Sequence, residues 1–247
     1  MSKIIAVWGS PNSGKTTCAV KLSAAIYERY NASVLMLSCD NVTPSLPTIF
    51  PNFKSDDLFS VGVPLSKTDI TQQELIKSIV TLKSKINLGF LGYKDGENKF
   101  TYPDYDKKKA RTFIEVLKSL ADFVVVDCTS TLDNSLSCFC VKEADEVIRL
   151  ATPTLKSISF FASQLPLYAD PAFNLDRQIV GLNCTENDCF MPIDEVKNHL
   201  KNVSFTLPYC REIRQQAMDG ELVKSVSDKK YAAKFKAIAD KVVRNNA

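Results

Sequence analysis

The chain has 247 residues, of which 45% are hydrophobic, and a formal net charge of +3. This length and composition allow one large α/β domain, and no Gly/Ser-rich or Pro-rich linker divides the sequence, so we expect a single domain over residues 1–247. The charge is too small to indicate nucleic-acid binding by itself, and no apolar run is long enough for a membrane span or a signal peptide, so we expect a cytoplasmic protein.

The eight cysteines lie mostly within apolar stretches and lack the paired spacing of metal ligands, so we interpret them as free thiols of a reducing compartment. Cys138 and Cys140 are the most closely spaced pair. With one histidine in the chain and no second pair, a zinc site is not expected.

The stretch from Ile4 to Thr17 joins an apolar run to a loop that fits the pattern G-x-x-x-x-G-K-[ST]. Glycine lets the backbone turn so that successive N–H groups point into one concavity. In such a loop Lys15 faces the β- and γ-phosphates of a nucleotide, and the Thr16 hydroxyl joins the coordination of Mg²⁺. The expected nucleotide contacts are Gly9, Ser10, Pro11, Asn12, Ser13, Gly14, Lys15, Thr16 and Thr17.

The surroundings of this loop support the match. The run before it shows no alternation, as in a strand buried on both faces, and the apolar residues after Lys15 recur at helical spacing. The loop therefore precedes a helix N-terminus, where backbone donors and the helix dipole favour an anion. A Gly/Ser/Pro turn that contains a lysine by chance is the alternative, and the flanking strand and helix disfavour it.

A second buried strand is predicted at Ser33 to Ser38, and it leads to Asp40. Ligands of open α/β sheets bind at the carboxyl ends of the strands, so we expect Asp40 near the phosphates. The other interpretation makes Asp40 a turn residue together with Asn41.

The middle of the chain is less regular. Four prolines between Asn41 and Lys67 predict a long surface segment of the kind that forms a switch or lid. Asp69 and Thr71, with Glu74, predict the capped start of a helix that runs through Lys85. A short strand at 87–91, a turn-rich segment at 93–105 and a helix at about 107–120 are predicted to follow.

The run Ala121 to Asp127 has the form of a Walker B strand, in which an apolar strand ends in an acid that holds Mg²⁺ directly or through water. Such strands are common in α/β proteins, so this pattern gains weight only from the loop at Gly9. Strands and helices then alternate. The predicted elements are strands at 146–150, 178–182 and 203–207 and helices at 154–163, 193–200 and 211–218, the last closed by Gly220.

This alternation predicts an α/β fold with a doubly wound, mainly parallel sheet and helices on both faces, the three-layer α/β/α arrangement of P-loop NTPases. The last predicted helix, 228–245, is basic and amphipathic. Such a helix can bind a membrane or DNA surface, or it can dock on the sheet, which is the interpretation that we favour. A second basic group consists of Lys107, Lys108, Lys109 and Arg111. It can bind DNA phosphates, or it can form a solvated helix start, which we again favour.

Taken in order, these motifs resemble the MinD/ParA group of P-loop ATPases over nearly the whole chain. The matching segments are GSPNSGKTT, the strand before Asp40, DFVVVDCTS, ADEVIRLATPTLKSI, the strand before Asn183, and LPYCREIRQQAMDGE.

The resemblance implies ATP with Mg²⁺, a nucleotide-dependent homodimer, a partner protein that stimulates hydrolysis, and slow hydrolysis used as a switch to position a cargo. It also implies that Asp40 orients water or Mg²⁺, that Asp127 is the Walker B acid, that Asn183 hydrogen-bonds adenine and that Pro208 lies beside the base. On this basis Lys15 and Asp40 are the candidate catalytic residues, and Thr16, Asp127 and Asp40 are the candidate metal ligands.

One position departs from the group. Its loop has the form KGGxGKT, whose first lysine reaches the partner's phosphates across the dimer, and that lysine aligns with Ser10. We therefore expect nucleotide binding to persist while turnover and dimerisation are weakened. A relative that binds nucleotide but hydrolyses almost none, as a scaffold or localisation factor of pilus or secretion machinery, is the alternative. A small-molecule kinase is disfavoured because the sequence has no Arg-rich lid segment.

Overall fold

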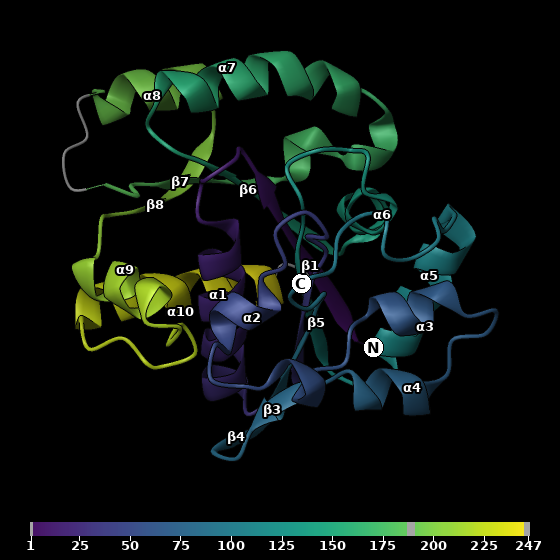
Figure 1. Ribbon diagram of the computed structural model, residues 1–247. Helices are drawn as coiled ribbons and strands as arrows, with labels where there is room; N and C mark the ends of the chain where they lie inside the picture. Colours follow the sequence, from purple (N-terminus) through teal and green to yellow (C-terminus); the bar gives the residue numbers. More distant parts are fainter. Residues whose placement is uncertain (1, 187–190, 245–247) are drawn as a thin grey trace.

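The structure, a computed structural model, describes residues 2–186 and 191–244. Within these residues an eight-stranded sheet has helices on both faces (Figure 1). The strands are β1 (Lys3–Gly9), β2 (Val34–Ser38), β3 (Val80–Leu82), β4 (Lys85–Leu91), β5 (Phe123–Asp127), β6 (Glu146–Ala151), β7 (Ile179–Asn183) and β8 (Val203–Leu207). The α-helices are α1 (Lys15–Tyr30), α2 (Leu46–Ile49), α3 (Gly62–Ser66), α4 (Gln72–Lys77), α5 (Lys107–Lys118), α6 (Ser135–Glu143), α7 (Leu155–Gln164), α8 (Ile193–Leu200), α9 (Arg211–Met218) and α10 (Lys229–Arg244).

The sheet has the order β3-β4-β2-β5-β1-β6-β7-β8, and its neighbouring strands are parallel except for the antiparallel pair β3 and β4. β1 lies between β5 and β6 and is buried at every position. A central parallel strand is covered on both faces, which is why its sequence is continuously apolar. The predicted doubly wound fold is confirmed.

Each face of the sheet has its own apolar core. One core joins β1 residues such as Ile5 and Val7 to α1, α9 and α10, and the other joins Ile4, Ala6 and Trp8 to the helices α3 to α8. Because neighbouring residues of a strand point to opposite faces, a single strand contributes to both cores. Figure 1 shows the two helical layers, with β1 running between them.

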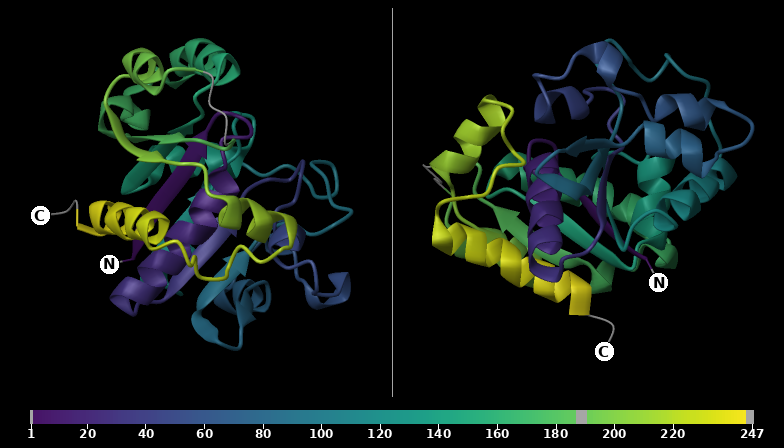
Figure 2. Two further views of the ribbon diagram at one scale, coloured as in Figure 1. Left: turned by 90° about the vertical axis from the view of Figure 1, so that its left-hand side faces the viewer. Right: turned by 90° about the horizontal axis from the view of Figure 1, so that it is seen from below.

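The C-terminal helix packs against the body of the protein, as we preferred from the sequence. Five residues of α10 on one face are buried: Tyr231, Phe235, Ile238, Ala239 and Val242. Both views of Figure 2 show α10 alongside α1, and Arg29 of α1 pairs with Asp240. The last predicted helical residue, 245, lies outside the described residues.

The predicted helix from Thr71 through Lys85 is wrong beyond its first turns. α4 ends at Lys77, and the chain then forms the hairpin of β3 and β4. The apolar residues of this segment fit either a helix or a strand, and packing decides between them. A Cβ on Gly89 of β4 would lie 2.5 Å from a methyl carbon of Ile79, so the hairpin depends on close approach at this glycine.

The segment 41–67 is also more ordered than predicted. It contains α2 and α3, and its apolar residues Leu46, Ile49, Val61 and Leu65 are buried in the two cores. A further helix, α6, lies in a stretch for which no element was predicted. The proline-rich segment is therefore not merely a surface loop.

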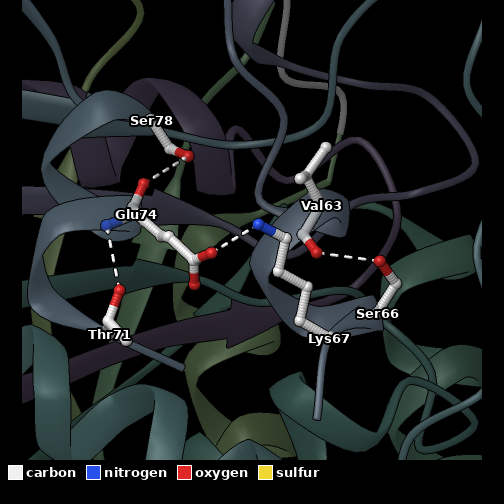
Figure 3. Close-up of polar contacts among 6 residues, drawn as sticks. All are labelled: Val63, Ser66, Lys67, Thr71, Glu74 and Ser78. Atoms are coloured by element: carbon white, nitrogen blue, oxygen red, sulfur yellow. Dashed lines mark hydrogen bonds and ion pairs between the residues drawn. The ribbon is translucent and has the colours of Figure 1, made fainter. Parts of the chain in front are cut away.

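Polar contacts join α3 to α4 (Figure 3). Lys67, directly after α3, forms an ion pair with Glu74 of α4, and the backbone N–H of Glu74 donates to the Thr71 hydroxyl at 3.3 Å. Thr71 is thus the N-cap of α4, as predicted. At the C-terminal ends of α3 and α4, the hydroxyls of Ser66 and Ser78 donate to the carbonyls of Val63 and Glu74.

Candidate nucleotide-binding site

The predicted phosphate-binding loop leaves the carboxyl end of β1 and passes close to β6. The backbone N–H of Ser10 donates to the carbonyl of Leu150 at 3.1 Å. A Cβ on Gly9 would lie 2.0 Å from that same carbonyl oxygen. Because the obstacle is backbone and cannot rotate away, this position requires glycine.

The loop ends at Gly14, which is the N-cap residue of α1 and has a left-handed conformation with φ of 80°. No side chain caps α1, and its first helical hydrogen bond runs from the N–H of Cys18 to the carbonyl of Gly14. The preceding N–H groups of Lys15, Thr16 and Thr17 have no helical partner and face the loop side. This uncapped end suits an anion, both by its donors and by the helix dipole.

Lys15 lies beside this helix end and is only half-exposed. Its ammonium donates to the carbonyl of Ser10 at 3.2 Å and to the hydroxyl of Ser130 at 2.8 Å. Burial lowers the pKa of Lys15, while the nearby charges of Asp127 and Asp40 oppose that shift. A phosphate would supply the negative charge that these two neutral oxygens lack.

Thr16 and Asp127 meet where α1 faces the end of β5. The Thr16 hydroxyl donates to Oδ2 of Asp127 at 2.7 Å, and Asp127 is only 3% exposed. Burial raises the pKa of Asp127 to about 7, against the opposing effects of the Thr16 hydrogen bond and the Lys15 charge. A hydroxyl and a carboxylate side by side are hard oxygen donors of the kind that Mg²⁺ prefers. These two residues therefore fit the predicted metal site.

Asp40 forms a turn and lies at the cavity beside Lys15. Its Oδ1 accepts the backbone N–H groups of Val42 and Thr43 at 2.9 and 2.8 Å, which makes it a turn residue. It also lines the same cavity as Lys15. Its assignment to water or Mg²⁺ stays a prediction.

Asn183, at the end of β7, reaches the phosphate-binding loop. Its side-chain nitrogen donates to the carbonyl of Ser13 at 2.9 Å, and a Cβ on Gly14 would lie 2.6 Å from that nitrogen. Pro208 is exposed directly after β8, whose last residue Leu207 pairs with Asn183. The structure brings Asn183 to the loop, and the contact of Asn183 and Pro208 with adenine stays a prediction.

Ser10, the position that aligns with the group's crossing lysine, is turned into the protein. It is 1% exposed, and its hydroxyl lies 2.9 Å from the hydroxyl of Ser157 in the first turn of α7. The Ser157 oxygen also accepts the backbone N–H of Thr152 at 3.1 Å. Ser10 thus anchors the loop to α7, and its side chain does not face the open side.

A cavity of about 540 Å³ opens beside Lys15 and Asp40. It is lined by Pro11, Asn12, Lys15, Asp40, Asn41, Val42, Lys99, Phe100, Asp104, Thr129, Ser130, Thr131, Asp133 and Asn134. Five lining residues directly after the Asp127 strand were not predicted, although their run of hydroxyl and polar side chains was a signal: Thr129, Ser130, Thr131, Asp133 and Asn134. Lys99 and Phe100 were not predicted either, because no local pattern connects them to the loop.

The basic run at 107–109 does not line this cavity. Lys107 and Lys108 begin α5 and, with Arg111, border a separate groove of about 400 Å³ between α5 and α6. The preference for a solvated helix start over a DNA contact stays a prediction. No helix within the described residues is long and apolar enough to cross a membrane.

The fold class is that of P-loop NTPases, as defined by the phosphate-binding loop, the uncapped N-terminus of α1 and the buried acid Asp127. No protein-family model matches the sequence, and no curated protein matches it either. Among solved structures, the chain is similar to the septum site-determining protein MinD of Pyrococcus horikoshii complexed with Mg-ADP, with 21% identity over 99% of this chain and 97% of that chain and a TM-score of 0.75.

Two further structures share this fold. A ParA family ATPase of Chlorobium tepidum has 16% identity over 97% of this chain and 99% of that one, with a TM-score of 0.78. MinD in the MinC:MinD cell division protein complex of Aquifex aeolicus has 16% identity over 98% and 96%, with a TM-score of 0.71. The chain therefore has the fold of the MinD and ParA ATPases, and the resemblance drawn from its motifs is confirmed at that level.

Proposed function

We propose that this chain is a MinD/ParA-type ATPase that binds ATP with Mg²⁺ and acts as a nucleotide-dependent switch in positioning or partitioning a cargo. The contact of Thr16 with Asp127, next to Lys15 and the uncapped end of α1, is the observation that carries the proposal. It joins the cation, the metal donors and the backbone donors that a magnesium nucleotide needs. The Mg-ADP complex of the similar MinD from Pyrococcus horikoshii supports the same ligand.

Bound Mg²⁺ would supply charge to the phosphoryl oxygens, with Thr16 and Asp127 as its protein donors. Lys15 would leave the oxygens of Ser10 and Ser130 for the β- and γ-phosphates. Asn183 and Pro208 are proposed to face the base and to favour adenine over guanine. Asp40 is proposed to orient the attacking water or the metal.

Hydrolysis by the chain alone is proposed to be slow, because Ser10 supplies no charge to the transferring phosphoryl group. A partner protein that stimulates hydrolysis and an ATP-dependent homodimer are further parts of the proposal. The MinC:MinD complex supports a protein partner for proteins of this fold. A non-hydrolysing scaffold of pilus or secretion machinery is the second candidate, and the buried Ser10 favours it.

Calorimetric titration of the chain with MgATP tests the binding proposal. The Lys15→Ala variant should lose most of the affinity, because charge-assisted contacts to phosphate are strong. Lys83→Ala, an exposed lysine in the turn between β3 and β4, is the matched control and should bind like the unmodified chain. Equal affinity in the Lys15→Ala variant would refute the proposal. Turnover measured with and without DNA, liposomes and candidate partners separates the switch from the scaffold.

A further inference from the structure

The cavity beside the phosphate-binding loop has a second wall, formed by the segment between β4 and α5. This segment, residues 92–106, lies far from the loop in sequence, and its residues 93–105 were predicted only as turn-rich. It carries Lys99 and Phe100 into the lining of the cavity that Lys15 and Asp40 share. We propose that Lys99 is a second phosphate-binding cation, which contacts the terminal phosphate of the bound nucleotide.

The segment is anchored by a buried carboxylate. Glu97 is 9% exposed and accepts hydrogen bonds from the hydroxyls of Ser60 and Tyr102, both at 2.6 Å, and from the backbone N–H of Lys94 at 3.0 Å. The ring of Tyr102 packs where a Cβ on Gly62 would lie, 2.1 Å from its nearest carbon. The base of the segment is thus fixed to the start of α3.

The tip of the segment is a tight turn. The N–H of Phe100 donates to Oδ1 of Asn98, the N–H of Asn98 donates to the hydroxyl of Thr101, and the N–H of Thr101 donates to the carbonyl of Asn98. These bonds fix the backbone of the turn that carries Lys99, whose side chain is exposed. The placement of Lys99 in the cavity lining therefore rests on hydrogen bonds within the segment.

The charges around the cavity give this position a function. Its lining, as the described residues define it, has the two ammonium groups of Lys15 and Lys99 against the carboxylates of Asp40, Asp104 and Asp133. The three carboxylates would repel the terminal phosphate of a triphosphate in this cavity, so a second cation besides Lys15 would stabilise it there. Without Lys99, one ammonium would face three carboxylates.

The side chain of Lys99 is free to reach a ligand. Its ammonium lies 4.8 Å from the centre of the Phe100 ring, an exposed contact of the weak kind. A phosphate oxygen offers a far stronger partner. On this proposal Lys99 adds a contact to the γ-phosphate, which a triphosphate has and a diphosphate lacks.

This inference rests on the proposed nucleotide site, and the test separates the two. The affinities for MgADP and for the non-hydrolysable MgAMPPNP are measured by calorimetry on the unmodified chain and on Lys99→Met, Lys99→Arg, Lys83→Met and Lys15→Ala. Lys99→Met should weaken MgAMPPNP binding about 5- to 20-fold, as loss of an exposed charge-assisted contact predicts. Its affinity for MgADP should change less than about twofold. Lys99→Arg should keep most of the preference for MgAMPPNP over MgADP. Lys83→Met should leave the affinities for both nucleotides unchanged.

Two results for Lys99→Met would overturn the inference: unchanged affinity for both nucleotides, or an equal loss of affinity for both. In either case, loss of binding in Lys15→Ala would show that the nucleotide site itself is intact. An unmodified chain that binds neither nucleotide would overturn the proposed function, and the inference with it. Circular dichroism of each variant confirms that it is folded.

Discussion

Thr16 of the phosphate-binding loop and Asp127 at the end of β5 are joined by a 2.7 Å hydrogen bond, although 111 positions separate them in the chain. The contact exists because β1 and β5 are parallel neighbours in the sheet, with Val7 opposite Asp127. Their carboxyl ends therefore deliver the loop and the acid to the same point. This contact places the two candidate metal donors beside Lys15 and the start of α1.

Replacing Asp127 with asparagine should weaken the dependence of nucleotide binding on Mg²⁺. The amide keeps the size of the side chain and an oxygen that accepts from Thr16, but it removes the negative charge that a divalent cation requires. Titrations with ATP in the presence of Mg²⁺ and in the presence of EDTA measure the effect. The unmodified chain should bind at least about tenfold more tightly with Mg²⁺, and the variant should lose most of that difference. An undiminished difference would exclude Asp127 as a metal ligand.

Replacing Asp40 should affect turnover more than binding. Asp40→Asn keeps an Oδ1 that accepts from Val42 and Thr43, whereas Asp40→Ala removes both bonds of the turn. If the charge matters for catalysis, both variants should hydrolyse ATP more slowly and bind it nearly normally. Single-turnover hydrolysis and calorimetry give the two quantities. If Asp40→Asn hydrolyses normally and only Asp40→Ala fails, Asp40 serves the turn alone.

Introducing lysine at Ser10 should not restore a crossing cation. The position is 1% exposed and faces Ser157, so a lysine there must bury an ammonium or displace the loop from α7. We expect Ser10→Lys to lower the midpoint of thermal unfolding and to weaken nucleotide binding. Ser10→Ala should cost only about 1 kcal/mol of unfolding free energy, the typical value of one hydrogen bond. A Ser10→Lys variant with normal stability and faster hydrolysis would show that the loop can turn this side chain outward.

The buried Lys21 should make stability rise with pH in the alkaline range. Its ammonium donates to the Gln216 side chain and to the carbonyl of Lys224, and burial lowers its pKa from 10.5 to about 8. Between these two values the unfolded chain holds a proton that the folded chain lacks, so raising the pH favours the folded state. Below about pH 8 both states are protonated and the effect is constant.

Urea unfolding of the unmodified chain and of Lys21→Met, at pH values from 7 to 10, isolates this effect from the other groups that titrate there. The difference in unfolding free energy between the two proteins should shift in favour of the unmodified chain by on the order of 2 kcal/mol over this range. A difference that does not change with pH would show that Lys21 titrates normally in the folded state.

The sequence by itself determined the features that depend on neighbours along the chain. A strand, a glycine turn and a helix start follow one another within residues 4–17, so the phosphate-binding loop was predictable from local spacing alone. The parallel fold followed from the alternation of apolar strands with amphipathic helices. Local periodicity failed between Ser78 and Lys85, where the same apolar residues suit a helix or a hairpin and where packing at Gly89 selects the hairpin, whereas the strand predicted at 87–91 is confirmed within β4.

Only the tertiary structure decided which distant residues meet at the site. It placed Asp127 on Thr16, Asn183 on Ser13 and Ser130 on Lys15, and it turned Ser10 inward to Ser157. Lys99 reached the cavity wall through the anchoring of Glu97, which no spacing indicates. The physical reason is that strand order and side-chain packing bring these groups together, and both arise from contacts between segments that lie far apart in the sequence.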